Sequence, residues 1–346
     1  RGLGDVYKRQ KQFFLDNKSR TITIGIDYNN QHDDRKRFKN NLGEKGDNTF
    51  DQIEKFKSTG LYFINQTNYK SGLLFRYGVR YDDNRIGTDS EAFISLNRFN
   101  PSLGVSYSIN DSNNIYLSTG TSFETPTLNE LSNNPNGNGL NKSLDPSSSI
   151  NYEIGWRKTT SNLMFEAIAY LINTDNEILP YELEQFPGKN FYRNVGSTRR
   201  YGIELSSQIL FSNGNLNLSY TNAKNTFSDF LLDGKDLKGF SLPGIPNQIL
   251  DVELILNLPK RSTLLINTRF IGELFADNLN ETQVSSYNLL NITYSKQIFN
   301  NSEIYLGVNN LLDVNYFDNI RINAFGKRYY EPAPKRNVHF GLNLSF

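Results

Sequence analysis

The segment Leu73-Leu-Phe-Arg-Tyr-Gly-Val-Arg-Tyr-Asp82 alternates apolar and polar side chains over ten residues. Successive side chains of a β-strand point to opposite faces, so Phe75 and Tyr77 share one face while Arg76 and Arg80 share the other. Helical spacing, with apolar residues three or four positions apart, is nearly absent from the chain. The segment therefore predicts a strand with one apolar and one polar face.

The same alternation recurs along the chain between clusters of Asn, Asp, Gly and Ser, which are typical of turns. Fourteen strands are expected, near residues 20–28, 59–68, 73–82, 98–109, 114–122, 149–158, 162–173, 199–210, 214–222, 247–257, 262–272, 285–296, 303–311 and 337–346.

The connections between these strands alternate strictly between long and short. The short ones fall at residues 69–72, 110–113, 159–161, 211–213, 258–261 and 297–302, and the long ones near 29–58, 83–97, 123–148, 174–198, 223–246, 273–284 and 312–336. Outer-membrane barrels have short periplasmic turns and longer extracellular loops, and their tilted strands take about 9–11 residues. We therefore predict an all-β fold, an antiparallel up-and-down transmembrane β-barrel with its apolar face toward lipid.

Soluble β-sandwiches and propellers also contain alternating strands, but their apolar faces share a core. Only 37% of the residues are hydrophobic, which favours the barrel because its apolar face needs no such core. The longest apolar run, residues 167–172, is far shorter than the roughly 20 residues that a membrane-spanning helix requires.

The composition argues against several kinds of function. The 37 Lys and Arg balance 36 Asp and Glu, so no basic field for nucleic acid is expected. The chain has no Cys and only His32 and His339, which leaves little material for a metal centre or a catalytic triad. We therefore expect no enzyme activity, no cofactor, no bound metal and no nucleic-acid partner.

Several strings occur together in an order that is typical of one family. Asn114 to Leu131 contains the pattern Phe-x-x-Pro-x-x-x-Glu-Leu, and later strings contain Glu-x-Gly, Asn-x-Gly followed by Gly-x-Glu, and a closing Asn-Leu-x-Asp-x-x-Tyr. The chain resembles the TonB-dependent outer-membrane receptors, and in particular the siderophore receptors. The positions that carry the resemblance are Phe123, Pro126, Glu130, Glu153, Gly155, Asn194, Gly196, Gly202, Glu204, Asn310, Leu311, Asp313, Tyr316 and the terminal Phe346. Ser147 stands where the family usually has Glu.

The resemblance implies a barrel of about 22 strands around a plug, of which about fourteen strands are expected here. Residues 11–346 would then be the carboxyl-terminal part of the barrel, without the plug, and residues 1–10 a non-native tail outside the fold. The implied function is import of a scarce ligand, most often a ferric siderophore, across the outer membrane of a Gram-negative bacterium. The implied partners are outer-membrane lipid, the iron chelate and the TonB complex, which would act on the missing amino-terminal region of a monomer.

Ligand binding is expected in the long loops, where aromatic and Arg side chains suit a bulky anionic chelate. The candidate residues are Tyr181, Phe186, Tyr192, Arg193, Arg199, Arg200, Arg328 and Tyr329. Packing against neighbouring loops is the alternative role for each of them. Lumen-facing Arg76, Arg80, Glu153, Arg157 and Glu204 are expected to pair with other groups across the inner wall.

Other functions stay open. Haem uptake is disfavoured because residues 131–142 contain no His. A passive diffusion channel, a receptor for cobalamin or carbohydrate, and an outer-membrane hydrolase that uses His32 or His339 are the alternatives.

Overall fold

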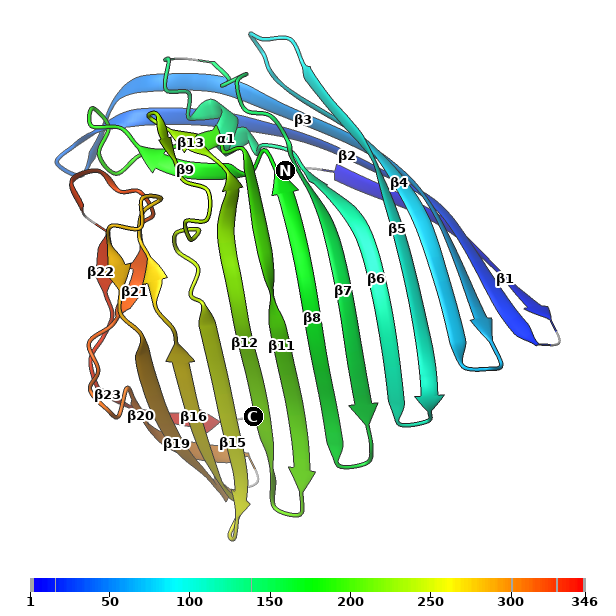
Figure 1. Ribbon diagram of the computed structural model, residues 1–346. Coiled ribbons are helices and arrows are strands. Elements are labelled where there is room, and N and C mark those ends of the chain that lie inside the picture. The colour runs from blue at the N-terminus through cyan, green and yellow to red at the C-terminus, as the bar shows by residue number, and fades with distance from the viewer. Residues whose placement is uncertain (1–2, 16, 138, 300, 328, 345–346) are drawn as a thin grey trace.

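The computed structural model describes residues 3–15, 17–137, 139–299, 301–327 and 329–344. Its main feature is a curved antiparallel sheet of fifteen strands, in which each strand pairs with its neighbours in chain order (Figure 1). These strands are β1 (Leu3–Leu15), β2 (Lys18–Asn41), β3 (Glu44–Tyr69), β4 (Leu73–Thr88), β5 (Ile94–Asn110), β6 (Asn113–Glu124), β7 (Ser147–Thr159), β8 (Leu163–Asp175), β11 (Ser197–Phe211), β12 (Gly214–Asp229), β15 (Gln248–Leu258), β16 (Ser262–Ile271), β19 (Tyr287–Phe299), β20 (Ser302–Asn309) and β23 (Asn337–Leu344).

The remaining elements lie in the long loops at one end of the sheet, opposite the short turns (Figure 1). They are α1 (Leu128–Ser132), β9 (Ile178–Glu182), β10 (Asn190–Asn194), β13 (Leu231–Leu232), β14 (Lys235–Asp236), β17 (Leu274–Phe275), β18 (Gln283–Val284), β21 (Phe317–Ile320), the 3₁₀ turn η1 (Phe325–Lys327) and β22 (Tyr330–Pro332). Neither helical element of the described residues has the length and apolar character needed to cross a membrane.

All fourteen expected strands are present, and β1 is an additional one. It pairs with β2 along its whole length, from Leu3 opposite Asn30 to Leu15 opposite Lys18. Residues 3–10, which the sequence analysis sets aside as a non-native tail, are therefore paired within the sheet, and their non-native origin stays a prediction. The open edge of β2 provides the hydrogen-bonding groups that this strand needs, whatever its side chains are.

The expected long loop at residues 29–58 is instead the upper part of the β2–β3 hairpin. Leu42 and Gly43 form its two-residue turn with φ values of 56° and 100°, as in the turns that suit the twist of a hairpin. The sequence does not predict these strand residues, because both faces of the segment are polar and no alternation of apolar and polar side chains is present. His32 accordingly lies in β2 and not in a loop.

The two faces of the sheet differ as the sequence predicts. Ile154 and Phe340 on the outer face are 58% and 70% exposed. On the inner face, Arg80 lies 2.6 Å from Asp27 and 2.8 Å from Asp82. The sheet thus has an apolar outer surface and a polar inner wall.

Pairing across the inner wall is confirmed for two of the expected residues. Besides Arg80, Arg157 lies 2.5 Å from Glu166 on the adjacent strand. Arg76, Glu153 and Glu204 lie on the same face, and no ion pair joins them to another described residue.

Tyrosine side chains on the inner wall cover glycines of the neighbouring strand. Gly155 is opposite Tyr116 in the register of β6 and β7, and a Cβ atom on Gly155 would lie 2.3 Å from the Tyr116 ring. The same arrangement joins Gly25 to Tyr62. Glycine at these positions lets the ring lie flat on the strand, a device that supports sheets with exposed glycines. This explains why the Glu-x-Gly string has its glycine at Gly155.

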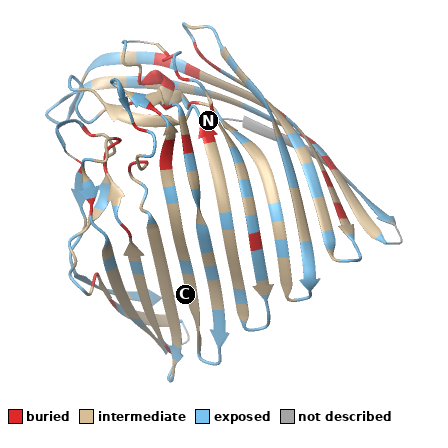
Figure 2. Cartoon of the chain, in the orientation of Figure 1, coloured by how far each residue is buried: buried red, intermediate tan, exposed pale blue. Residues whose placement is uncertain are grey.

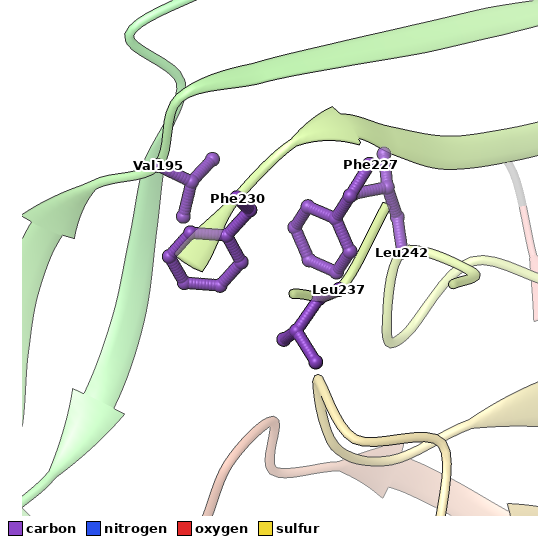
Figure 3. Packing of buried hydrophobic residues seen from close by; sticks show 5 residues of the cluster. All are labelled: Val195, Phe227, Phe230, Leu237 and Leu242. Carbon is purple, nitrogen blue, oxygen red and sulfur yellow. The ribbon is translucent and has the colours of Figure 1, made fainter. Parts of the chain in front are cut away.

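The apolar core lies at the loop end and not inside the sheet. Figure 2 shows many of the buried residues at the upper end of the strands and in the loops. One cluster of buried side chains comes from the end of β12 and from the loops after β10 and β12 (Figure 3), and consists of Val195, Phe227, Phe230, Leu237 and Leu242. The rings of Phe227 and Phe230 have centroids 5.0 Å apart. The loops are therefore packed against each other into a fixed surface.

Candidate ligand-binding site

The Phe-x-x-Pro-x-x-x-Glu-Leu string builds the loop that contains α1. Pro126 is buried, and Phe123 is half-buried at the end of β6. The Glu130 carboxylate accepts a hydrogen bond of 2.7 Å from the Thr127 backbone N–H, and the Thr127 hydroxyl accepts one of 3.2 Å from the Glu130 N–H. This capping box fixes the start of the short helix. It directs Leu131 into a buried cluster.

Asn194 ties two loops together. Its amide nitrogen donates to the carbonyls of Asp145, at 2.8 Å, and Asn176, at 2.7 Å, and its oxygen accepts from the Asp145 N–H at 2.8 Å. Close to it, a Cβ on Gly196 would lie 2.2 Å from the Asp229 carbonyl oxygen, and one on Gly202 would lie 2.4 Å from that of Asn222. Gly196 and Gly202 therefore have no room for a side chain, because the backbone of a neighbouring segment lies close to them. Asn194 carries an amide that bonds to such backbone.

The closing string has a similar structural role. Asn310 has a φ of 49°, and its side chain accepts from Val314 N–H at 3.0 Å and donates to Val314 C=O at 2.8 Å. Asp313 accepts from the Arg336 N–H at 3.1 Å. Two further residues complete the set: Leu311 donates its N–H to the Leu290 carbonyl, and Tyr316 packs on Tyr287 with ring centroids 5.1 Å apart. Phe346 lies outside the described residues.

The β9–β10 hairpin brings four of the predicted ligand-binding residues into one segment: Tyr181, Phe186, Tyr192 and Arg193. The Arg193 guanidinium lies 4.2 Å from the centroid of the Tyr181 ring. Phe186 is about half exposed and lies beside the fully buried Phe191, with ring centroids 5.7 Å apart. Lys189, at the same hairpin, lies 4.7 Å from the Phe191 ring centroid. Cations and aromatic rings therefore share this surface.

Tyr192 of this hairpin and the remaining predicted residues make other contacts. Tyr192 packs against the buried cluster around Leu131, and Tyr329 is 7% exposed in a third loop cluster. Arg199 and Arg200 follow in β11 and point to opposite faces. Arg328 lies outside the described residues.

The contacts of the two β11 arginines differ accordingly. Arg200 pairs with Glu177 and donates to the Thr198 hydroxyl at 3.0 Å. Arg199, on the outer face, donates to Asn173 at 3.0 Å.

Arg35 and Arg37 of the β2–β3 hairpin lie near the β9–β10 hairpin. Neither was among the predicted ligand-binding residues. Arg37 donates to Asn133 at 2.9 Å, next to α1, and Arg35 lies 3.0 Å from Glu54. Burial lowers the pKa of Lys189 below its usual 10.5, and the positive charges of Arg37 and Arg35 lower it further. We call Arg35, Arg37 and Lys189 the cationic cluster. The basic run Arg35-Lys36-Arg37 is the feature of the sequence that could have indicated the two arginines.

The cationic cluster is only partly neutralised within the described part of the chain. Arg35 alone has an ion-pair partner there, and no described carboxylate lies within 4.0 Å of Arg37 or Lys189. Burial lowers the pKa of Arg37 and the charge of Arg35 lowers it further, while the Glu54 carboxylate offsets part of this effect. Since repulsion among the three cations is relieved by an anion, the arrangement suits a negatively charged ligand. The described ranges contain no group of three or more His, Asp or Glu placed to hold a metal ion.

Comparisons with known proteins agree with this architecture. A family model described as TonB dependent receptor-like, beta-barrel, matches residues 2–311. The structure is similar to that of the ferric citrate transporter FecA in its unliganded form, with a TM-score of 0.80 and 18% identity over 100% of this chain and 54% of FecA. It is also similar to the ferric-catecholate import receptor Fiu from Escherichia coli K12, with a TM-score of 0.74 and 17% identity over 99% of this chain and 55% of Fiu.

A third similar structure is the copper transporter OprC, with a TM-score of 0.72 and 17% identity over 100% of this chain and 56% of OprC. The chain thus spans about half the length of each of these proteins. At these identities the likeness concerns the fold, and the ligands of the three proteins differ.

Proposed function

Because this chain belongs to the family of TonB-dependent receptors, whose barrel model covers residues 2–311, we propose that it serves in the import of a ferric siderophore across an outer membrane. Energy would come from the TonB complex, and the apolar outer face would lie in the lipid of a Gram-negative outer membrane as part of a monomer. Receptors of this family are transporters and not enzymes, in agreement with the sequence-based expectation.

The observation that carries the proposal is the cationic cluster beside the aromatic side chains of the β9–β10 hairpin. Guanidinium and ammonium groups attract a multiply charged anion, and rings such as the half-exposed Phe186 provide surface for planar groups of a chelate. The iron would arrive inside the chelate, so the chain itself needs no metal ligands. Three neighbouring cations would contribute little to the binding of a neutral sugar.

Uptake by cells tests this proposal. The complete gene product should be produced in a host without its own ferric-siderophore receptors, and uptake of a radiolabelled iron(III) catecholate should be measured, with iron(III) citrate and cobalamin as competitors. We expect uptake that stops when TonB is deleted and that a competing iron(III) chelate reduces. Uptake that persists without TonB would indicate a passive channel, and competition by cobalamin alone would indicate a different ligand class.

Substitutions connect the uptake to the cationic cluster. The double variant Arg37→Gln with Lys189→Gln should lower the affinity for the iron(III) catecholate by about tenfold or more, since a loss of 1.4 kcal/mol is a factor of ten. The matched control removes the same charge from the exposed Lys238 and Lys335, and should bind as the parent does. Equal binding by both double variants would contradict the assignment of the site.

A further inference from the structure

The outer face of β2 to β5, four neighbouring strands at one side of the sheet (Figure 1), changes in character along its length. Its apolar part ends toward the long loops in aromatic side chains: the rings of Tyr81 and Phe99 have centroids 4.7 Å apart, and Tyr28 is 43% exposed near them. Girdles of this kind lie at the level of the lipid headgroups in membrane barrels. With this face in lipid, the side chains just beyond the rings therefore meet the headgroups.

Three basic side chains lie on the outer face in that position. Lys57 of β3 is directly opposite Arg85 of β4 in the register of the two strands, and Lys55 is two residues further along β3, on the same face. Arg85 is four residues beyond Tyr81, which is about 13 Å along a tilted strand. We call Lys55, Lys57 and Arg85 the outer basic patch.

The charges of the outer basic patch are only partly balanced by the protein. Like charges directly opposite each other on adjacent strands destabilise a sheet. Asp83 lies 2.9 Å from Arg85, whose side chain is 58% exposed. In the part of the chain that the structure describes, no carboxylate lies within 4.0 Å of the ammonium group of Lys55 or Lys57. One carboxylate therefore serves three cations.

The next carboxylates on this face make other contacts. Asp34 and Asp51 lie 3.4 Å and 3.7 Å from the Lys36 ammonium, and Asp89 accepts a hydrogen bond of 3.3 Å from the Ile53 N–H. None of them neutralises the outer basic patch.

An exposed aromatic ring lies beside the patch. Phe93 is 43% exposed, and the Lys57 ammonium lies 5.4 Å from the centroid of its ring. The ring covers Gly87, the residue opposite Lys55, since a Cβ on Gly87 would lie 3.0 Å from it. Apolar surface next to unbalanced cations suits an amphiphile whose anionic group adjoins its acyl chains.

We propose that the outer basic patch binds a phosphate group of an outer-leaflet glycolipid, with the phosphate oxygens between Lys57 and Arg85. A guanidinium matches phosphate with two parallel hydrogen bonds and an ammonium adds a point charge, so the anion relieves the repulsion between the two side chains. The occupant is a lipid and not a soluble anion, because the patch faces outward directly beyond the aromatic girdle. This site rests on the outer-membrane placement of the proposed function and not on the imported ligand.

A second pair of outer-face cations extends the same chemistry to β11 and β12. Lys224 is opposite Tyr201, which is 43% exposed, and Arg199 lies two residues beyond that ring and donates to Asn173 at 3.0 Å. Among the described residues, no carboxylate lies within 4.0 Å of the charged groups of these two side chains. Arg199 thus faces the headgroup layer rather than the loop surface.

Lipid binding to the purified full-length receptor tests the site. Native mass spectrometry from detergent should show that bisphosphorylated lipid A is retained in preference to a neutral glycolipid with similar acyl chains. The double variant Lys57→Gln with Arg85→Gln should lower the affinity for lipid A by about tenfold or more. Equal retention of the charged and the neutral lipid by the parent would overturn phosphate recognition.

Two further variants control for position and for packing. Lys18→Gln with Lys158→Gln removes the same charge from the outer face at the short-turn end of the sheet, and should bind lipid A as the parent does. Lys57→Arg with Arg85→Lys keeps both charges and should retain binding. Equal affinity in the two Gln double variants would overturn the site.

A soluble competitor and an uptake assay separate the remaining outcomes. Inorganic phosphate at the same concentration should not displace lipid A, and displacement would reject a lipid as the occupant. Lipid A binding that depends on Lys57 and Arg85 in a receptor that imports no iron chelate would retain this site and reject the proposed function. Import of the iron(III) catecholate with equal lipid A binding in both Gln double variants would do the reverse.

Discussion

Arg321 donates to the Glu182 carboxylate across two loops whose residues lie 139 positions apart in the chain. The Glu182 side chain is 1% exposed, and its second oxygen accepts from the backbone N–H of Gly188 at 3.1 Å and of Phe325 at 3.3 Å. One buried carboxylate therefore fixes the β9–β10 hairpin to the loop before β23. This hairpin is therefore the rigid side of the proposed site.

Replacing Glu182 should loosen both loops. In Glu182→Gln the Arg321 guanidinium loses its charged partner, and the loss of such a contact costs about 1–3 kcal/mol of local stability. Hydrogen exchange should become faster in residues 178–194 and 317–332. The control Glu184→Gln changes an exposed carboxylate of the same hairpin and should leave exchange unaltered. Equal exchange in the two variants would show that the ion pair does not hold the loops.

Asn194 should be needed for the order of the α1 loop. Asn194→Ala removes three hydrogen bonds to Asp145 and Asn176, which lie at the exposed surface and contribute about 0.5–1.5 kcal/mol each. Limited proteolysis within residues 125–146 should become faster. Asn190→Ala, at the other end of β10, is the matched control. If proteolysis is equally slow in both variants, Asn194 does not tie these loops.

The strands could be predicted from the sequence because the alternation of Leu73–Asp82 and its counterparts follows from a bilayer on one side and water on the other. The same rule missed the upper β2–β3 hairpin, where Asp33 to Arg37 are polar on both faces. It also missed β1, whose place depends on backbone pairing with β2.

The candidate site was predictable only in part. The aromatic and basic composition of residues 181–200 indicated a segment in which Arg193 lies against Tyr181, since neighbours in a hairpin are also neighbours in space, and its role in ligand binding stays a prediction. It could not show that Arg37, more than 140 positions earlier in the chain, approaches Lys189. Nor could it show that Tyr329 is used for packing, because burial in a loop cluster depends on segments that are distant in sequence.

The glycine of the Glu-x-Gly string should resist substitution. In Gly155→Ala the new Cβ would lie 2.3 Å from the Tyr116 ring, which must then move away from the strand. Overpacking of this kind costs about 1–3 kcal/mol, so the purified barrel should unfold at a lower temperature on heating in detergent. Gly104→Ala is the control, because the nearest atom to its Cβ is 3.9 Å away. A fall in unfolding temperature of the same size in both variants would contradict this role of Tyr116.

Ligand binding should weaken as the solution becomes alkaline. The pKa of Lys189 is lowered from 10.5 in the free protein, mainly by burial and then by Arg37 and Arg35. A bound anion favours the charged ammonium, so the complex takes up a proton as pH falls through that lowered pKa and loses it as pH rises. The Kd for the iron(III) catecholate should therefore increase between neutral pH and 10.5. Lys189→Arg keeps its charge over this range and should remove the dependence; a dependence that survives in this variant would come from another group.

Which face of the sheet meets lipid can be measured in bilayers. Single spin labels at Ile154→Cys and Glu153→Cys of the full-length receptor in bilayers should be relaxed by different reagents. Because the apolar face lies in lipid, Ile154→Cys should respond to lipid-soluble oxygen and Glu153→Cys to a water-soluble nickel chelate. The reverse pattern, with the position of Ile154 in water and that of Glu153 in a dry apolar interior, would contradict this placement.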